Sequence, residues 1–486
     1  MSMQKNQWIL LLGFFLFNFI YVQLYSQAPD TAWTRNYHRG SWESAYSIQQ
    51  TSDDGYIMVG PSHLLDDNYY EIFLLKIDVN GDSLWSKVIG NDTNLFPNCV
   101  KEDPDGNYII AGEKQYVSGS RKGFLLKTDE YGDSLWTILL EGSGNSVTNY
   151  VTCTLDTGYA FTGYRYVSTN QSMYLCKANA TGDSTSLKIY DRGGHEIGNC
   201  IIQTSDKGYF IGGQTDYHTA GKYDFYVVKT DSVGDTLWTR TYGLSDNDYC
   251  YSVQQTTDGG YILFGTTESP GYTTLSLAIK IDSLGDVMWQ RIFDRGTGAD
   301  YGRSVVQTSD GGYIFGGSSI NPYQSQDFCF TRTDPDGNIQ WIKTVGGSDK
   351  DWAYSVLQTT DGGYVLAGER SYLMPRGYDF WVVKLNAFPT GIEKKNLGSN
   401  TFQLFQNYPN PFNPTTIIEI YLPEANRVTL KIYNILGEEV STLFSGQLFS
   451  GDYKFQWDAR NYSSGIYYYQ IQAGDYQETK KMVLLR

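Results

Sequence analysis

The chain has 486 residues and a formal net charge of −16, and it contains 51 Gly and 41 Tyr but only six Cys and four His. This composition excludes a disordered chain, a helical bundle and a disulfide scaffold, because aromatic residues are abundant, good helix formers are outnumbered and cysteines are sparse. It also argues against a nucleic-acid-binding protein, since phosphate repels an acidic chain that has no basic stripe.

Residues 1–28 have the pattern of a secretory signal peptide. Lys5 supplies the positive start, residues 8–24 are mostly apolar, and Ser26 and Ala28 place small side chains at a cleavage site. The alternative is a membrane anchor, but polar residues interrupt the apolar run. No second long apolar run follows, so we expect an exported mature protein without a transmembrane segment.

A unit of about fifty residues then repeats seven times. Each copy contains a Tyr that follows an Asp- and Gly-rich turn, and successive anchor tyrosines are 50 to 52 residues apart. The anchors are Tyr56, Tyr108, Tyr159, Tyr209, Tyr261, Tyr313 and Tyr364. Each unit has the pattern of four short strands, which in the fifth unit are residues 251–256, 261–265, 276–282 and 287–293.

Seven such units predict an all-β fold, a seven-bladed β-propeller over residues 29–386. The seventh unit stops after its third strand, residues 378–385, and the missing piece precedes the first unit, where residues 30–37 read DTAWTRNY against DTLWTRTY at 235–242. We expect this N-terminal strand to complete the last blade, because closing the ring removes exposed sheet edges. The alternatives are an open solenoid or a string of small sandwiches.

A Trp recurs on the fourth strand, four residues after a turn Gly, in the motif D-x-x-G-[DN]-x-x-W. The positions are Trp85, Trp136, Trp238, Trp289 and Trp341. The third unit departs from the motif and has Ser186. The motif resembles the Trp-docking repeat of quinoprotein-type propellers and, more loosely, the Asp-box of sialidase propellers. We predict that each Trp fills the wedge between neighbouring blades.

Residues 387–400 lose the repeat and are predicted to be a linker to a second domain, residues 401–486. Short alternating strands between Gly, Asn and Pro turns predict a small β-sandwich there. Its motifs resemble the type A C-terminal sorting domain of the type IX secretion system of Bacteroidota-like bacteria. The residues that carry this resemblance include Pro409, Asn410, Pro411, Phe412, Asn413, Pro414, Gly437, Gly465, Tyr467, Lys480 and Lys481.

This resemblance implies that the chain passes to the periplasm by its signal peptide and that the type IX secretion machinery then carries it across the outer membrane. It also implies that the sorting domain is usually removed there and that the product is secreted or tied to the cell surface. The alternative is an ordinary sandwich appended for binding.

No catalytic or metal-binding pattern is evident. The four His lack zinc-ligand spacing, and the chain has neither a Gly-x-Ser-x-Gly elbow nor a phosphate-binding Gly loop. Residues 103–107 and 334–338 resemble fragments of a calcium loop but lack the distal Glu, so we interpret them as hairpin turns stabilised by Asp and keep calcium as the alternative. We therefore predict no metal and no cofactor, and we expect the Cys to be buried small hydrophobic residues.

Because strands alternate in direction, the two faces of the ring differ. One face carries near-identical tight turns, whereas the loops between second and third strands differ among copies, as binding loops on a rigid scaffold do. These loops are residues 61–71, 113–123, 164–173, 214–223, 266–275, 318–326 and 369–378. Their tyrosines, which are candidate ligand-binding residues, are Tyr69, Tyr70, Tyr116, Tyr164, Tyr166, Tyr217, Tyr223, Tyr272, Tyr323, Tyr372 and Tyr378.

A second set of candidate residues lies thirteen positions before the anchor tyrosines, just before the innermost strand, where five of the seven copies have an acid. These acids are Glu43, Glu196, Asp248, Asp300 and Asp351. A ring of carboxylates near the mouth of the channel would suit a cation or a polyhydroxylated ligand. The alternative is that they are solvated loop carboxylates that cap nearby N–H groups.

The sequence thus favours a non-enzymatic binding or adhesion propeller, secreted or on the cell surface, with a glycan or protein ligand. The first alternative is a propeller enzyme, either a hydrolase or lyase of extracellular glycans or a quinoprotein-like oxidoreductase. The second is a structural protein of the surface or matrix.

Overall fold

The computed structural model describes residues 28–64, 68–90, 92–140, 142, 144–219, 222–268, 273–295, 298–321, 325–372, 377–387, 402–423, 426–448 and 451–485. Nearly all of the predicted signal peptide and linker, and the candidates Tyr272 and Tyr323, lie outside these residues. The chain divides into two compact units, residues 1–389 and 390–486, and each is described by itself. In the described segments, no helix has the length and hydropathy needed to span a membrane.

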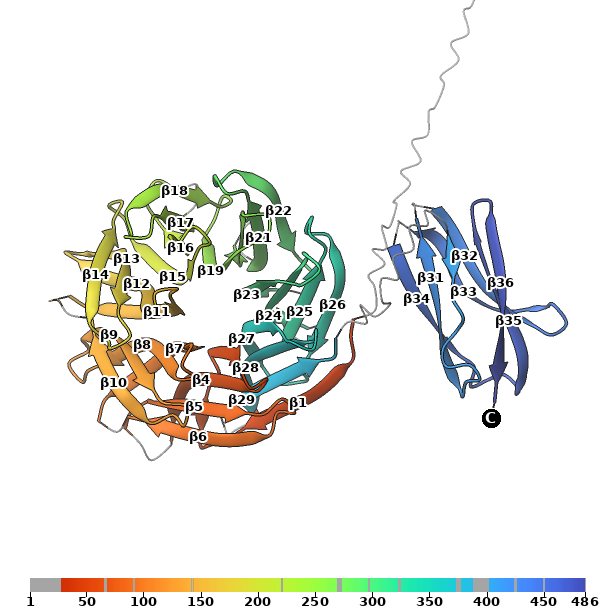
Figure 1. The fold of residues 1–486 in the computed structure, drawn as a ribbon, viewed down its shortest axis with the longest axis horizontal. Helices are drawn as coiled ribbons and strands as arrows, with labels where there is room; N and C mark the ends of the chain where they lie inside the picture. The colour runs from red at the N-terminus through yellow and green to blue at the C-terminus, as the bar shows by residue number, and fades with distance from the viewer. Residues whose placement is uncertain are drawn as a thin grey trace, which may run out of the picture. The chain divides into compact units, whose positions relative to one another are not determined.

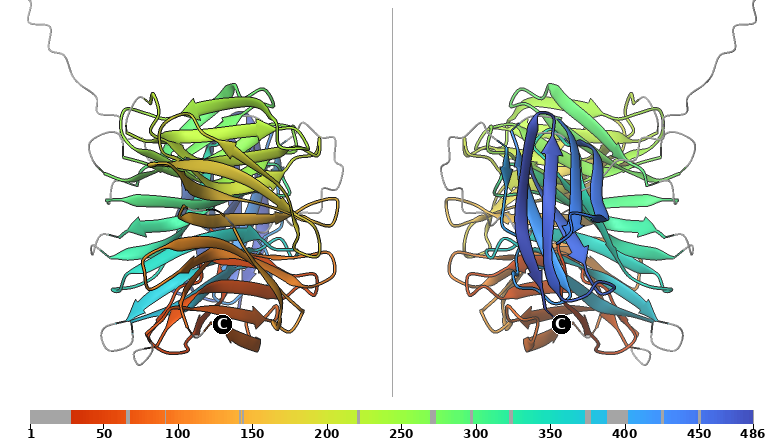
Figure 2. Two further views of the ribbon diagram at one scale, coloured as in Figure 1. Left: turned by 90° about the vertical axis from the view of Figure 1, so that its left-hand side faces the viewer. Right: turned by 90° about the vertical axis from the view of Figure 1, so that its right-hand side faces the viewer.

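The first unit is a closed ring of seven blades, and Figure 2 shows their strands running across the thickness of the ring. The first strand of each blade lies towards the centre in Figure 1, and the fourth strand lies outermost. The first strands are β3 (Ser47–Gln50), β7 (Asn94–Glu102), β11 (Ser146–Cys153), β15 (Glu196–Gln203), β19 (Asp248–Gln255), β23 (Asp300–Gln307) and β27 (Asp351–Gln358). The second strands are β4 (Tyr56–His63), β8 (Tyr108–Gln115), β12 (Tyr159–Val167), β16 (Tyr209–Thr215), β20 (Tyr261–Thr267), β24 (Tyr313–Ile320) and β28 (Tyr364–Tyr372).

The third and fourth strands complete each antiparallel sheet. The third strands are β5 (Glu71–Ile77), β9 (Arg121–Thr128), β13 (Asn170–Ala178), β17 (Asp224–Thr230), β21 (Leu275–Ile281), β25 (Gln326–Thr333) and β29 (Gly377–Leu385). The fourth strands are β6 (Ser83–Ile89), β10 (Ser134–Leu139), β14 (Ser184–Tyr190), β18 (Thr236–Tyr242), β22 (Val287–Phe293) and β26 (Ile339–Val345), and in the seventh blade β1 (Thr31–Tyr37).

Local sequence explains the strand order within a blade. Gly259 and Gly285 adopt φ angles of +83° and +89° in the two tight turns of the fifth blade, a conformation that Gly takes without steric cost. Residues of β20 and β21 are buried without interruption, whereas β22 is partly exposed along its length. The two middle strands therefore form the core of the blade, and the fourth strand faces solvent on one side.

The N-terminal strand closes the ring, as the sequence predicts. β1 pairs antiparallel with β29, which places Asn36 opposite Trp381 and Tyr37 opposite Phe380. A short strand, β2 (Trp42–Glu43), then pairs with both β29 and β4 and so links the seventh blade to the first. A non-local pair of strands, contributed by the two ends of the repeat array, therefore holds the circle shut.

The recurring Trp does pack against the next blade, and its partner there is the anchor Tyr. The pairs and the distances between their ring centroids are Trp85–Tyr108 5.9 Å, Trp136–Tyr159 5.9 Å, Trp238–Tyr261 6.4 Å, Trp289–Tyr313 5.7 Å and Trp341–Tyr364 5.6 Å. Trp33 of the closing strand makes the same contact with Tyr56, at 6.3 Å. Where the third blade has Ser186, the Lys177 ammonium lies 5.5 Å from the Tyr209 ring instead.

The second unit is a β-sandwich, also as predicted. One sheet contains β30 (Gln403–Leu404), β31 (Thr415–Leu422) and β34 (Gly451–Asp458). The other contains β32 (Asn426–Asn434), β33 (Glu439–Leu448), β35 (Gly465–Ala473) and β36 (Tyr476–Leu484). Ile418, Leu430, Trp457 and Tyr469 belong to the core between the two sheets.

The six cysteines are all free thiols. Cys153 is half-buried and the other five are buried, which confirms that they behave as small hydrophobic residues.

Replacing Trp33 tests how strongly the closing strand contributes to stability. Trp33→Ala removes the aromatic contact to Tyr56, and we expect the free energy of unfolding to fall by about 2 kcal/mol, less than for a fully buried Trp because Trp33 is half-buried. Urea unfolding followed by circular dichroism measures this change. Thr34→Ala, at an exposed position of the same strand, is the control, and equal effects of the two substitutions would contradict the assigned role.

Candidate binding site

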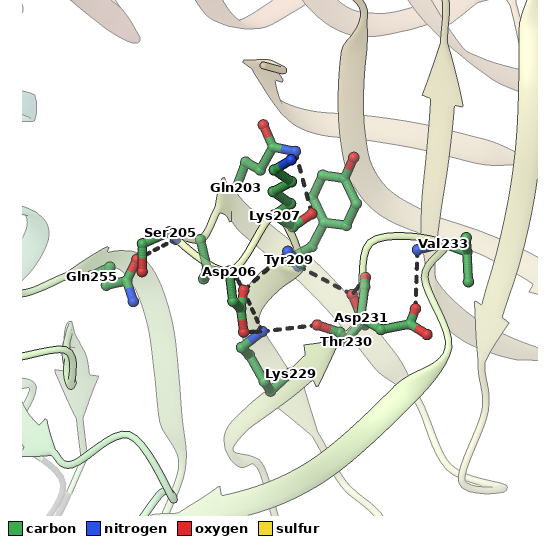
Figure 3. A network of polar contacts seen from close by, with 12 residues as sticks. Gln203, Ser205, Asp206, Lys207, Tyr209, Lys229, Thr230, Asp231, Val233 and Gln255 are labelled. Atoms are coloured by element: carbon green, nitrogen blue, oxygen red, sulfur yellow. Dashed lines mark hydrogen bonds and ion pairs between the residues drawn. The ribbon is translucent and has the colours of Figure 1, made fainter. Parts of the chain in front are cut away.

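The face with tight turns is a scaffold held by repeated ionic contacts. Figure 3 shows the fourth blade, where buried Lys229 donates to Asp206 (Nζ–Oδ2 2.8 Å) and Gly208 N donates to Asp206 Oδ1 at 3.0 Å. Burial alone would raise the pKa of Asp206, but the bonds from Lys229, Thr204 and Gly208 outweigh it and lower the pKa to about 2. The equivalent pairs are Lys76–Asp53, Lys280–Asp258, Arg332–Asp310 and Lys384–Asp361, whereas in the second blade Lys127 pairs with Asp103, which lies two positions earlier in the turn.

The same turns also connect one blade to the next. In Figure 3, Ser205 N donates to Gln255 Oε1 of the following blade at 2.8 Å. The equivalent bonds are Ser52–Glu102, Leu155–Gln203, Thr257–Gln307, Ser309–Gln358 and Thr360–Gln50. The last of these joins the seventh blade to the first. Side chains on this face thus bond to other residues of the propeller, in agreement with the prediction that this face serves as a scaffold.

The structure places the five predicted acids inside the protein. Glu43, Glu196, Asp248 and Asp351 are 0% exposed and Asp300 is 3% exposed. Four of them lie opposite a hydroxyl side chain of the second strand, namely Ser62, Thr215, Thr267 and Ser319. Backbone N–H groups of the preceding loops also donate to them.

Asp248 shows how this arrangement works. Leu244 N donates to its Oδ2 at 2.6 Å, and the Thr267 hydroxyl donates to the same carboxyl group. The acid thus holds the link between blades against the start of β19. These carboxylates cap N–H groups, as the alternative interpretation of the sequence expects, but they are buried and not solvated. They therefore present no open acidic surface at the channel mouth.

Burial also shifts the pKa of these acids. Burial raises the pKa of Asp248 to about 6, with Asp224 and Asp246 adding to the rise and the hydrogen bonds opposing it. Burial raises the pKa of Asp351 to about 7, with Arg370 opposing the rise and Asp327 and Asp349 adding to it. Burial is also the main cause that raises the pKa of Glu43, Glu196 and Asp300.

The predicted loop tyrosines that the structure describes are half-buried except Tyr166, which is exposed, and their ring contacts are mostly local. Tyr70 lies between His63 and Phe96, with ring centroids at 4.8 and 4.9 Å. The remaining contacts are Tyr116 with Lys114, Tyr166 with Tyr164, Tyr217 with His218 and Arg192, Tyr223 with Tyr249, Tyr372 with Arg370 and Tyr378 with Trp42.

Two of the predicted loops are shorter than expected. β12 and β13 continue their pairing as far as Val167 and Asn170, so Tyr166 is a strand residue. β28 likewise extends to Tyr372. Strand pairing persists here because the backbone groups at the ends of both strands still find partners across the hairpin.

Sequence reasoning missed the residues ten positions before each anchor Tyr, which lie on the innermost strands or, for Tyr46, directly before one. They are Tyr46, Asn98, Asn149, Asn199, Tyr251, Arg303 and Tyr354, and all seven are half-buried. In three consecutive blades the Asn amide donates to a carbonyl of the next blade, as from Asn149 to Gly198 O at 2.9 Å. In the other four blades the position is aromatic or cationic. Counting ten residues back from the anchors, rather than thirteen, would have found them.

The aromatic and cationic residues at these inner positions, together with neighbouring aromatic residues, form one continuous set of side chains that we call the aromatic arc. It comprises Tyr46, Tyr249, Tyr251, Tyr301, Arg303, Trp352 and Tyr354, from four neighbouring blades. The Arg303 guanidinium lies 4.4 Å from the Tyr251 ring centroid and 5.9 Å from that of Tyr354. Tyr354 in turn contacts Tyr46, with centroids 5.0 Å apart.

Two further contacts widen the arc. Tyr301 and Trp352 of adjacent blades lie 5.0 Å apart, and Tyr249 lies 6.5 Å from Tyr251. Tyr249 also contacts the predicted loop residue Tyr223 at 5.7 Å. The arc therefore continues from the innermost strands into the face that carries the variable loops.

Buried Glu369 of β28 sets the protonation state at one end of the arc. Its carboxyl group accepts hydrogen bonds from Ser44 and Tyr354. Burial raises the pKa of Tyr46 to about 12, and Glu369 adds to this rise while Arg303 opposes it. Burial and the nearby Glu369 also raise the pKa of Tyr354. Both phenols therefore stay protonated and remain hydrogen-bond donors at neutral pH.

The two turns that resemble calcium-loop fragments use their carboxylates internally. Asp103 Oδ1 accepts from the backbone N–H groups of Asp105 and Asn107, both at 3.0 Å, and its other oxygen contacts Lys127 Nζ at 2.8 Å. Asp334 Oδ1 accepts in the same way from two backbone N–H groups of its own turn. This is the bonding of an Asp-stabilised hairpin turn.

In the sandwich, the predicted sorting residues lie on the last strand and on the segment beside it. Phe412 is buried and exchanges backbone hydrogen bonds with Val483 O and Leu485 N, at 3.0 and 2.9 Å. Asn410 Oδ1 accepts from Val483 N at 2.9 Å. Around them, Pro409, Pro411 and Asn413 are exposed, Pro414 is half-buried, Gly437 lies in a turn, and Gly465, Tyr467, Lys480 and Lys481 lie on β35 and β36.

Fold and sites together define an all-β protein with a closed seven-bladed propeller and a C-terminal sandwich. Residues 406–485 match the family described as the secretion system C-terminal sorting domain. The C-terminal module is therefore a sorting domain of type IX secretion cargo, and the protein is exported to the cell surface or beyond it by that machinery.

Among curated proteins, no sequence matches this chain. Several solved structures are similar to it at low identity. The type IX secretion component PorZ of Porphyromonas gingivalis is 8% identical, with 93% of this chain and 82% of that chain covered and a TM-score of 0.32. The propeller domain of the Trilobed protease from Pyrococcus furiosus is 12% identical, with 71% and 95% covered and a TM-score of 0.41. The lectin BP39L from Burkholderia pseudomallei is 5% identical, with 71% and 98% covered and a TM-score of 0.47.

The buried acids predict an unusual dependence of stability on pH. Between about pH 4 and 6 the folded protein keeps a proton on Asp248 that the unfolded chain has released, so the free energy of unfolding falls as the pH rises through this window. Asp248→Asn removes this contribution. We expect the variant to gain about 1 to 2 kcal/mol over the wild type at pH 7.5 and nothing at pH 4.

Urea unfolding at a series of pH values measures this difference, with Asp92→Asn, at an exposed position before β7, as the control. A variant that is destabilised equally at both pH values would show that Asp248 is charged in the folded protein and stabilises it.

Proposed function

We propose that the propeller is a non-enzymatic binding protein that holds an extracellular glycan against the aromatic arc. The observation that supports this proposal is the continuous set of half-buried aromatic side chains on the innermost strands of three blades and directly before that of a fourth, all of them neighbours. Aromatic rings offer flat apolar faces to the C–H groups of sugars, and tyrosine hydroxyls add hydrogen bonds at low cost in side-chain entropy.

The arc also has the rigidity that such a site needs. All of its residues except Tyr46 lie on strands, and Arg303 is held between Tyr251 and Tyr354. Side chains on paired strands keep their geometry better than side chains on loops. Asparagines complete the inner ring, and the oxygens of their amides, like the phenols, are suitable partners for sugar hydroxyls.

The loop tyrosines of the sequence prediction form the outer part of the same proposed surface. Tyr223, which contacts Tyr249, connects the two parts. The exported location brings this surface into contact with extracellular polysaccharide. In this proposal the buried acids shape the loops and do not touch the ligand.

A glycan array with the full chain, followed by calorimetry on the best oligosaccharide, tests the proposal. We expect Tyr251→Ala and Tyr354→Ala each to weaken binding about tenfold, because each loses a stacking surface. Tyr251→Phe keeps the ring and should retain most of the affinity. Tyr131→Ala, at a 60% exposed residue in a turn between third and fourth strands, is the matched control.

Three outcomes would contradict the proposal. The first is that no glycan binds, and the second is that binding persists in a Tyr251→Ala, Tyr354→Ala double variant that still folds. The third is that the wild-type protein cleaves or oxidises the glycan that it binds, which would make the propeller an enzyme.

A further inference from the structure

A cluster of metal-ligating side chains lies where the first and last blades join. His38 directly follows the closing strand β1, Glu43 belongs to β2, and Asp379 belongs to β29. Within the described residues, this is the group of His, Cys, Asp and Glu side chains whose donor atoms lie close enough together to hold a metal ion. These segments come from the two ends of the propeller sequence, so no local sequence motif signals the cluster.

The donor atoms converge. His38 Nδ1 lies 2.7 Å from Asp379 Oδ1 and 3.9 Å from Glu43 Oε2, and the three donor atoms all lie within 4.8 Å of one another. In a tetrahedral site with bonds of about 2.1 Å, ligand atoms lie about 3.4 Å apart, so small movements of these side chains would complete it. The side chain of His38 is 45% exposed, which leaves a path for an ion and for a water ligand.

Glu43 supplies an independent sign that a cation belongs here. Its side chain is 0% exposed, and Oε1 accepts a hydrogen bond from the Ser62 hydroxyl at 3.2 Å. Oε2, which points towards His38, is buried and has no hydrogen-bond donor among the described residues. A buried carboxylate oxygen without a partner is costly, and a bound cation removes that cost.

The surrounding charges permit a cation. Arg39, one residue after His38, is engaged with Ser62 Oγ at 3.0 Å and with Glu71 at 2.9 Å. Asp379 is 4% exposed, so both carboxylates lie in a setting where solvent screens their charge weakly. The two carboxylates and the imidazole of the cluster are therefore available to coordinate the ion.

We propose that His38, Glu43 and Asp379 form a site for a divalent transition-metal ion, best suited to Zn²⁺, that fastens the closing strand to the last blade. One imidazole nitrogen and two carboxylate oxygens are a ligand set that zinc accepts, with water in the fourth position. Calcium and magnesium prefer sites made of oxygen alone. The ion binds the closed ring and not the unfolded chain, so it raises stability by mass action.

Metal analysis and thermal unfolding of the full chain test the proposal. After treatment with EDTA and dialysis against ZnCl₂, we expect about one zinc per chain and a midpoint temperature at least about 2 °C higher, both reversed by EDTA. Equal concentrations of Ca²⁺ and Mg²⁺ should leave the midpoint unchanged. Co²⁺ should give the visible absorption of a tetrahedral complex.

Variants locate the bound ion. His38→Gln should lose the zinc, the shift in midpoint and the cobalt spectrum, whereas His195→Gln, which changes a His between the third and fourth blades, should retain all three. Glu43→Gln keeps the acceptor for Ser62 and removes the charge, so it should fold at least as stably without metal and show no zinc-dependent shift.

Two results would overturn the proposal. One is the absence of stoichiometric zinc on the wild-type protein. The other is unchanged zinc binding in the His38 and Glu43 variants, which would place the ion elsewhere on the chain.

Discussion

Packing between blades depends, at six of the seven junctions, on the contact between a Trp on the outer strand of one blade and the buried anchor Tyr of the next. A blade is a small sheet with two apolar faces, and neither face is covered until a neighbouring blade packs against it. Trp33 extends this contact across the seam, because β1 sits in the last blade while its Trp meets Tyr56 in the first. A repeat array with two open ends thereby becomes a closed ring in which the last blade also has a fourth strand.

The polar groups on the two faces of the ring have different structural roles. On the turn face, buried Lys and Arg side chains neutralise turn carboxylates, and Gln side chains bond to the N–H groups of the adjacent blade. On the loop side, buried acids hold the links between blades. Neither set forms an open surface for a glycan, and the innermost positions of the blades, where the repeat has Asn in three blades and aromatic residues or Arg in the other four, are the candidates that remain.

The sequence predicted the loop tyrosines but none of the seven residues of the aromatic arc, and it predicted at the channel mouth five acids that the structure buries. The position thirteen residues before the anchor is acidic in five copies, and this regularity suggested an acidic ring. The structure buries those acids, four of them opposite Ser or Thr hydroxyls and Asp351 opposite Arg370. The position thirteen residues before the anchor, which is regularly acidic, therefore has a structural role in the blade. The position ten residues before the anchor, which varies between Asn, Tyr and Arg, is half-exposed.

The sequence by itself determined the number of blades, their strands and turns, the closing strand and the sorting domain. Each of these depends on short-range features: period-two burial, Gly turns, and motifs that repeat in phase. Only the tertiary structure decided which side chains meet across blades, such as Tyr46 with Tyr354 and His38 with Asp379. Those pairs are separated by about three hundred residues in the chain, and their proximity arises only when the ring closes.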